Sequence, residues 1–453
     1  MDFAFRRAVT EARKSGNLCF AALLSEDRID KAVGEARELW QGWIYTPAVT
    51  VWVFLAQCLS RDHSCRDAVA QLIAWRVARG LRPCSAKTGA FCTAREDLPE
   101  EACQELVRDT GRGVAEEAPQ VWLWLGRNVV MGDGSTLTMA DTEANQAEYP
   151  QMASQLPGCG FPIARIVVLF ALSVGTVLEG AIGRYQGKQT GETALFRTLL
   201  GALREGDVFL ADRCFSGWCD IVLLQRRGVD VVLRKHQARP TDFRTGQRLG
   251  KDDHLVVWKK AVRPEWVSED EYDTFPPELT LREVRVRVDQ RGFRTKEVLV
   301  VTTLLDAEQY PAAEIAKLYR CRWQAELDLR SLKIVLEMDH LRCKTPHRVR
   351  NEFYMHLIAY NLIRKTLAAA AIRAGVEPWE ISFKGALQTI TQMLLTLHAP
   401  ISVHDWCDAV LDAIAAHQVG NRPDRVEPRV LKRRGKTYSL MIKTRAEYKK
   451  LAR

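Results

Sequence analysis

The sequence predicts an α/β protein in which a mixed β-sheet is covered by helices and flanked by helical terminal regions. Residues 1–120 show apolar side chains at three- and four-residue spacing, which is typical of helices. Residues 121–185 contain short runs of β-branched and aliphatic residues, and residues 190–233 alternate helix-like and strand-like segments. Antiparallel strands followed by β-α-β alternation indicate a mixed sheet with helices on its faces.

Length and composition set the outer limits. The chain has 453 residues, 47% hydrophobic and 27% charged, which suits about two to four globular domains with ample core. No run approaches the ~20 apolar residues of a transmembrane helix, and the start lacks the apolar segment of a secretory signal. Twelve cysteines are scattered without a CxxC pair or zinc spacing. We therefore expect reduced thiols in a cytoplasmic protein that has no membrane partner.

The N-terminal region, residues 1–120, is predicted to be a helical domain. Residues 30–43 and 64–79 have the helical period, with tryptophans such as Trp43 and Trp52 available as core anchors. Such a module can bind DNA ends in the way that helix-turn-helix units read DNA. It can equally be a packing domain, and the residues themselves leave both interpretations open.

The middle region, residues 121–345, is predicted to form the sheet. A first strand-like run ends at Asp133, and a later one ends at Asp212. Residues 235–297 hold many charged residues and four prolines, and we interpret them as a β-rich insertion that does not continue the sheet. The other expected strands cover residues 164–173, 176–185, 207–211, 229–233 and 298–305, and the helices cover 190–203 and 216–227.

The C-terminal region, residues 346–453, is predicted to be helical with a basic tail. A long apolar helix is expected at 349–375, with further helical segments to about His417. Residues 421–453 contain twelve Lys and Arg against three Asp and Glu, so the tail carries +9, as much as the whole chain. This charge indicates a polyanion partner, most simply nucleic acid, although a solvated terminus would have the same composition.

Residues 319–333 form the most unusual stretch of the chain. On a helix with about 100° per residue, one stripe is apolar and one face can meet water. Between the apolar stripe and the water face, within roughly 80° of arc, lie one carboxylate, three cations and one phenol. This composition suits the binding of phosphates and a metal ion. The plain alternative is an amphipathic helix with Glu/Arg pairs. The apolar stripe is Cys321, Ala325, Leu329, Leu332 and Leu336, the water face is Arg320, Gln324, Asp328 and Ser331, and the mixed face is Tyr319, Arg322, Glu326, Arg330 and Lys333.

Three acids occupy places where a metal site can form: Asp133 and Asp212 at strand ends, and Glu326 on the helix. Strand ends project side chains to the rim of a sheet, so a helix packed across that rim would bring the three carboxylates together. Carboxylates are the ligands that Mg²⁺ or Mn²⁺ prefers, and two ions about 4 Å apart can serve both oxygens of phosphodiester exchange. Each aspartate alone could instead be a turn residue, as in Asp-Gly, or an ion-pair partner.

The motifs resemble those of a known family. The helix spaces its tyrosine, arginine, glutamate and lysine as Y-(2)-R-(3)-E-(6)-K. This spacing, together with DGST at Asp133 and DRCFSGW at Asp212, resembles the cut-and-paste bacterial insertion-sequence transposases named after insertion sequence four. The resemblance covers roughly residues 125–365.

This resemblance implies an RNase H-like catalytic core, interrupted by the β-rich insertion, with a triad of Asp133, Asp212 and Glu326 that binds two Mg²⁺ or Mn²⁺ ions. Trp258 and Trp266 in the insertion are candidates for stacking a flipped base, but each can also be an ordinary packing residue. The residues implied to hold DNA phosphates are Tyr319, Arg322, Arg330 and Lys333.

The predicted function is that of a DNA transposase that nicks DNA with a metal-bound water, cleaves the second strand through a hairpin and joins the ends to target DNA. The expected partners are the terminal inverted repeats and target DNA, with the protein acting as a homodimer. A structure-specific nuclease would need the same site without strand transfer. A repressor descended from a transposase would need only to bind DNA. Clustered carboxylates do not help DNA binding, so an intact acid triad argues against this alternative.

Overall fold

The computed structural model describes residues 1–38, 40, 43–287, 297–420 and 441–451 of the chain. The chain divides into two compact units. Unit 1 consists of Met1–Asn128, Val168–Ile182 and Gln324–Val419, and unit 2 consists of Val129–Val167, Gly183–Trp323 and Gly420–Arg453. The division into three domains made from the sequence stays a prediction. Among the described helices, none combines the length and the apolar character needed to cross a membrane.

The N-terminal part of unit 1 is helical, as predicted. The helix expected at 64–79 is confirmed, whereas the one expected at 30–43 is wrong because Gly34, with a φ of +56°, ends a shorter helix. Trp52 is buried, but Trp43 is 98% exposed and does not anchor the core. The helices are α1 (Asp2–Ser15), α2 (Glu26–Val33), α3 (Pro47–Leu59), α4 (Cys65–Ala78), α5 (Gly89–Glu96) and α6 (Glu100–Glu116).

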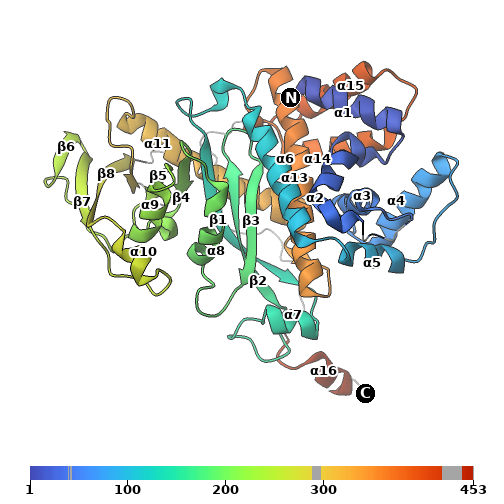
Figure 1. The fold of residues 1–453 in the computed structure, drawn as a ribbon, viewed down its shortest axis with the longest axis horizontal. Helices are drawn as coiled ribbons and strands as arrows, with labels where there is room; N and C mark the ends of the chain where they lie inside the picture. Colours follow the sequence, from blue (N-terminus) through green and yellow to red (C-terminus); the bar gives the residue numbers. More distant parts are fainter. Residues whose placement is uncertain (39, 41–42, 288–296, 421–440, 452–453) are drawn as a thin grey trace. The chain divides into compact units, whose positions relative to one another are not determined.

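The long helix α13 (Pro346–Ala374) is the core of unit 1. It begins with proline at its first turn and ends at Gly375 in the left-handed conformation, so its bounds follow from local sequence. It lies beside α6, as Figure 1 shows. The buried Asn361 of α13 donates to the carbonyl of Val107 at 3.2 Å and accepts from the backbone nitrogen of Val177 at 2.7 Å. The other C-terminal helices are α14 (Phe383–Met393), α15 (Val403–Ala415) and α16 (Arg445–Leu451).

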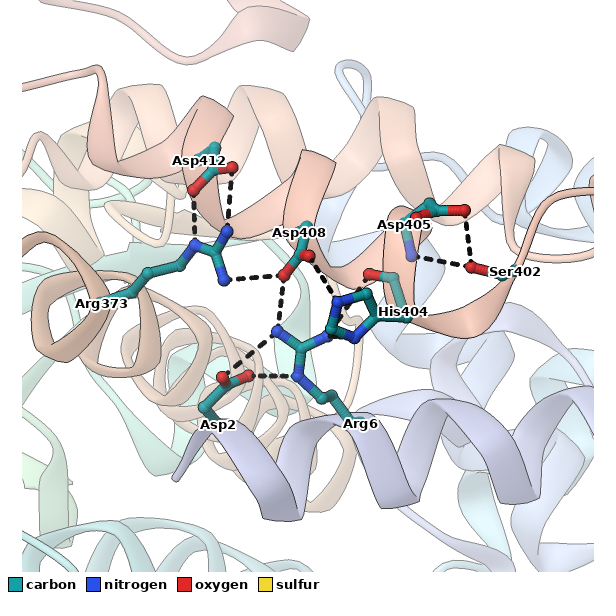
Figure 2. Close-up of polar contacts among 8 residues, drawn as sticks. All are labelled: Asp2, Arg6, Arg373, Ser402, His404, Asp405, Asp408 and Asp412. Carbon is teal, nitrogen blue, oxygen red and sulfur yellow. Dashed lines mark hydrogen bonds and ion pairs between the residues drawn. The ribbon is translucent and has the colours of Figure 1, made fainter.

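An ion-pair network joins α1 to α15 and α13 within unit 1 (Figure 2). Arg6 of α1 donates to Asp408 of α15 at 2.6 Å and to Asp2 at 3.0 Å. Arg373 of α13 donates to the same Asp408 at 2.7 Å and to Asp412 at 2.5 Å. The network is partly exposed, so it orients the N-terminal helix more than it stabilises the unit.

The ten strands among the described residues form a mixed sheet in which nine follow the order β3-β2-β1-β4-β5-β9-β8-β7-β6. Strands β1, β4 and β5 are parallel, whereas β5, β9, β8, β7 and β6 pair antiparallel. The mixed sheet, with helices between its strands along the chain, confirms the predicted α/β fold class. The strands are β1 (Val129–Met139), β2 (Ile163–Ala171), β3 (Val177–Arg184), β4 (Val208–Ala211), β5 (Asp230–Arg234), β6 (Gln247–Gly250), β7 (Asp253–Lys259), β8 (Glu278–Arg287), β9 (Glu297–Thr302) and β10 (His340–Leu341).

The remaining helices lie between these strands along the chain. The segments expected at 190–203 and 216–227 are confirmed as helical, although the first is a short α-helix followed by a 3₁₀ turn. The helices are α7 (Glu143–Glu148), α8 (Glu192–Thr198), α9 (Trp218–Gln225), α10 (Glu269–Asp273), α11 (Ala312–Cys321) and α12 (Trp323–Arg330).

The insertion at 235–297 is β-rich, as predicted, but the expectation that it does not continue the sheet is wrong. Strand β8 pairs with β9 from Arg282↔Thr302 onward, and β7 pairs with β8 (Figure 1). The insertion continues the sheet because β9 pairs with β5 on one side and with β8 on the other. A buried ion pair between Arg282 and Asp253, at 2.8 Å, ties β8 to β7. Part of the insertion, residues 288–296, lies outside the described residues.

The basic tail predicted at 421–453 falls mostly outside the described residues, which resume at 441. Within the described tail, Arg445–Leu451 forms the exposed helix α16. The cysteines that the structure describes are free thiols, in agreement with the expectation from their spacing.

Candidate active site

Asp133 and Asp212 stand on neighbouring strands of unit 2. In the parallel pairing of β1 with β4, Gly132 is opposite Ala211, and each aspartate follows directly after its member of that pair. Strand β4 ends at Ala211, as predicted, but β1 continues to Met139, so the expectation of a strand end at Asp133 is wrong. The register nevertheless places the backbones of the two aspartates at neighbouring positions, which is compatible with the metal-site hypothesis.

Gly134 is part of a strand and not of a turn. Its backbone nitrogen donates to Oδ1 of Asp133 at 2.9 Å, which orients that carboxylate. A Cβ atom on Gly134 would lie 2.5 Å from the carboxyl carbon of Glu192 and 2.9 Å from its Oε1. A side chain at position 134 would therefore require the Glu192 carboxylate to move. Because Gly134 lies inside β1, the turn interpretation of Asp-Gly is wrong.

Glu192, at the start of α8, is a site residue that sequence reasoning missed. Its carboxylate pairs with Arg165 at 3.3 Å and accepts from the thiol of Cys214 at 3.7 Å. Burial raises the pKa of the Cys214 thiol to about 12, with further contributions from Glu192, Asp212 and Asp133. The thiol of Cys214 thus contacts Glu192 and is within electrostatic reach of Asp212 and Asp133. The only sequence feature related to Glu192 is the glycine of DGST, because a glycine permits another residue to approach closely. It does not identify which residue does so.

The two aspartates fit a divalent metal ion. Oδ1 of Asp212 is buried and has no hydrogen-bond partner within the described part of the chain. The nearest cation in an ion pair with Asp212 is Arg234, whose Nη1 lies 3.8 Å from that oxygen. Such an unsatisfied carboxylate oxygen suits Mg²⁺ or Mn²⁺, which prefer hard oxygen ligands. Among the described residues, no three His, Cys, Asp or Glu side chains already stand in a ligating arrangement.

Tyr319 and Arg322 belong to unit 2, as Asp212 does. Tyr319, on α11, is buried, and burial raises the pKa of its phenol to about 12. The charge of Arg322 opposes this rise, and the charge of Asp212 adds to it. Tyr319 is therefore within electrostatic reach of both Arg322 and Asp212, and the role of Tyr319 and Arg322 in binding DNA phosphates stays a prediction.

The signature stretch is not one regular helix. Helix α11 ends at Cys321, α12 follows from Trp323, and Ser331–Val335 forms a π-helical turn in which Leu336 donates to the carbonyl of Ser331 at 3.0 Å. The expectation of a single helix over 319–333 is therefore wrong in detail. The π turn contains Lys333, whose Nζ lies 3.1 Å from Asp339. Turns of this kind are frequent at functional sites.

The buried face of α12 was predicted correctly except at Asp328. Ala325, Leu329 and Leu332 are buried, as the apolar stripe requires. Asp328, expected to face water, is 0% exposed and forms an ion pair with Arg364 of α13. Helical geometry alone could not predict this burial because it depends on a cation from a segment 36 residues away.

The site residues are divided between the two units. Asp133, Asp212, Tyr319 and Arg322 belong to unit 2. Within it, Asp133 and Asp212 follow residues that are paired across two neighbouring strands, and Tyr319 is within electrostatic reach of Asp212. Glu326, Arg330 and Lys333 belong to unit 1. Convergence of Glu326 with the two aspartates stays a prediction.

The two tryptophans suggested for base stacking each have a guanidinium against the ring. Trp258 is 7% exposed, donates its indole N–H to Glu283 at 3.2 Å and has Arg239 4.0 Å from its ring centroid. Trp266 has Arg197 3.5 Å from its ring centroid. A base that stacked on Trp258 would have to displace Arg239, so the stacking role stays a prediction for both residues.

Comparison with known proteins defines the class. The family model of the transposase DDE domain matches residues 125–362, more than half of the chain, and the chain belongs to this family. It is accordingly a DNA transposase, an enzyme that acts on DNA. Enzymes of this family generally use divalent metal ions.

Within that class, the chain is similar to the transposases of bacterial insertion sequences. It is 26% identical over 398 residues to the transposase InsG for insertion sequence element IS4 of Escherichia coli (strain K12), covering 85% of this chain and 84% of InsG. A segment of 66 residues is 39% identical to the putative transposase InsL for IS186A of the same strain, covering 15% of this chain and 18% of InsL. The piggyBac transposase in a synaptic complex with hairpin DNA matches with a TM-score of 0.40 and 11% identity, over 91% of this chain and 84% of that one.

Proposed function

We propose that this transposase excises an insertion sequence by cut-and-paste transposition and joins it to target DNA, using Asp133, Asp212 and Glu326 as metal-binding carboxylates. The observation that carries the proposal is the β1–β4 register, which sets Asp133 beside Asp212, with a buried Asp212 oxygen that lacks a hydrogen-bond partner among the described residues. Glu326 would supply the third carboxylate from α12.

The chemistry would be phosphodiester exchange at one site. Two bound Mg²⁺ or Mn²⁺ ions would supply charge stabilisation for the attacking and leaving oxygens. Asp133, Asp212 and Glu326 would hold these ions, while Arg322 grips a DNA phosphate bidentately and Tyr319 positions it. Water would attack first and release a 3′-hydroxyl, which would attack the opposite strand to form a hairpin and release the flanking DNA. A second water would hydrolyse the hairpin and regenerate the 3′-hydroxyl, which would then attack a phosphodiester of the target DNA and displace a target 3′-hydroxyl.

The DNA partners would be the terminal inverted repeats of the element and a target duplex, bound by a homodimer in the bacterial cytoplasm. Arg330 and Lys333 would contact DNA phosphates, since both follow Glu326 on the signature stretch. The basic tail would add affinity that does not depend on sequence.

The test is single-turnover cleavage of a labelled transposon-end duplex by Asp133→Ala, Asp212→Ala and Glu326→Ala. Each variant should lose cleavage while retaining its fold and DNA binding, because each removes a metal ligand and no core side chain. Glu314→Ala, on α11, is the matched control and should cleave like the parent. Mg²⁺-dependent cleavage at the parental rate by any of the three variants would exclude that residue. Cleavage without strand transfer in the parent would favour a nuclease.

A further inference from the structure

A groove of about 1060 Å³ lies entirely within unit 1. Its walls come from the turn between α3 and α4, from α12 with the π turn that follows, from the short helix Pro378–Glu380 and from α14. Glu326 is not part of its lining, so the groove is a separate feature from the proposed metal site. The triad and the signature spacing leave this surface unexplained.

The charge of the groove is positive. Arg61, Arg330 and Lys384 line it, their side chains are exposed, and none of them forms an ion pair with another described residue. Of its three acids, Asp328 pairs with Arg364, Glu337 lies 3.4 Å from His63, and Asp67 accepts a hydrogen bond from Gln71 at 2.7 Å. Arg61, Arg330 and Lys384 therefore outnumber the two acids that have no Lys or Arg partner among the described residues, and this excess of positive charge favours a ligand with phosphates.

The groove also offers a surface for flat rings. Trp379 lines it with 42% of its surface exposed. Gln388 and Gln392 are exposed one helical turn apart on α14, so their amides lie on the same face of that helix. An amide can donate and accept hydrogen bonds, which matches the edge of any nucleobase. Base edges and faces are accessible in this way only where the strand is unpaired.

We propose that this groove binds a short unpaired segment of DNA, with phosphates on Arg61, Arg330 and Lys384 and a base stacked on Trp379. The inference rests on the proposed function, in which hairpin formation and strand joining expose unpaired DNA. The combination of a positively charged groove with an exposed aromatic ring is the one by which proteins hold single strands without sequence preference.

The experiment measures binding of a fluorescein-labelled eight-nucleotide oligothymidylate by fluorescence anisotropy, with the full-length chain in EDTA. Trp379→Ala should weaken binding roughly 5- to 100-fold, the effect of losing one base–aromatic stack. Trp379→Phe should retain most of the affinity because it keeps a stacking ring. Trp43→Ala replaces a tryptophan that is 98% exposed elsewhere in unit 1, and it should bind like the parent.

The salt dependence of binding provides a second readout. Lys384→Ala should reduce the slope of log K against log salt by about 0.7, the value for one phosphate contact to a single strand, while Lys14→Ala on α1 should not change it. Equal affinities for Trp379→Ala and Trp43→Ala, or equal slopes for the two lysine variants, would overturn the proposal. Because no metal is present, loss of cleavage in the triad variants tests the proposed function separately from this groove.

Discussion

Removal of Arg364 should destabilise unit 1 strongly, because Arg364 neutralises Asp328, a carboxylate on the buried face of α12. The side chain of Asp328 is 0% exposed and that of Arg364 is 4% exposed. Arg364 also donates from Nε to the hydroxyl of Tyr360 at 2.8 Å. Burial raises the pKa of Asp328 and the charge of Arg364 opposes that rise, so the arginine keeps the carboxylate ionised inside the unit.

The expected magnitude follows from the desolvation of the pair. Arg364→Leu leaves one uncompensated buried charge and should cost about 3–5 kcal/mol in free energy of unfolding, as should Asp328→Leu. The double variant removes both charges and should be much less destabilised than the sum of the single variants, giving a coupling energy of about 3 kcal/mol or more. Arg373→Leu, which removes an exposed ion pair on the same helix, should cost less than about 1 kcal/mol.

The assay is urea unfolding of the four variants, combined with hydrogen exchange of the amides of α12. The single variants should lower the unfolding midpoint and speed exchange in α12, and the double variant should recover most of both changes. Additive effects in the double variant, or a cost below about 1 kcal/mol for Arg364→Leu, would refute the reasoning.

Three further predictions concern pH, packing and salt. His356 is buried, and burial followed by the charges of His63 and Arg342 lowers its pKa from 6.5 to about 3. As the pH falls from about 6.5 to 5, the unfolded chain binds a proton at His356 that the folded chain does not bind. The free energy of unfolding should therefore drop by about 2 kcal/mol by pH 5. In His356→Leu the urea midpoint should depend much less on pH between 5 and 7.5. Gly134→Ala should lower the thermal midpoint by the equivalent of about 1–3 kcal/mol, because the new methyl group meets the Glu192 side chain. Adding Glu192→Ala to this variant should restore the midpoint. Truncation after His417 should make the salt dependence of DNA binding shallower, and an unchanged slope would show that the tail does not contact DNA.

The features that local sequence determines were predictable. The run of apolar residues before Asp212 required a buried strand, and Val208–Ala211 forms one. The helical period of the signature stretch correctly placed Leu329 and Leu332 in the core. Both features depend on residues close together in the chain. The family resemblance of the two aspartate motifs, and not local sequence, implied that Asp133 and Asp212 are adjacent, and the β1–β4 register places their backbones at neighbouring positions.

The features that long-range contacts determine were not predictable. Asp328 is buried because Arg364 lies against it, and no periodicity within α12 reveals that cation. Charges and prolines at 235–297 indicated a separate insertion, yet β8 joins the sheet through β9, which follows it in the chain. Glu192 approaches Gly134 from another element, so its position beside Asp133 emerges only in three dimensions.

The central claim is that Glu326 acts as a metal ligand together with Asp133 and Asp212, and Glu326→Cys tests it most directly. A thiolate is a softer ligand than a carboxylate, so the substitution should disfavour Mg²⁺ more than Mn²⁺. In single-turnover cleavage of a labelled transposon end, we expect Glu326→Cys to be inactive with Mg²⁺ and to recover cleavage with Mn²⁺, while Glu314→Cys behaves like the parent with both ions. Cleavage by Glu326→Cys at the parental rate in Mg²⁺ would show that Glu326 is not a metal ligand and would contradict the proposed site.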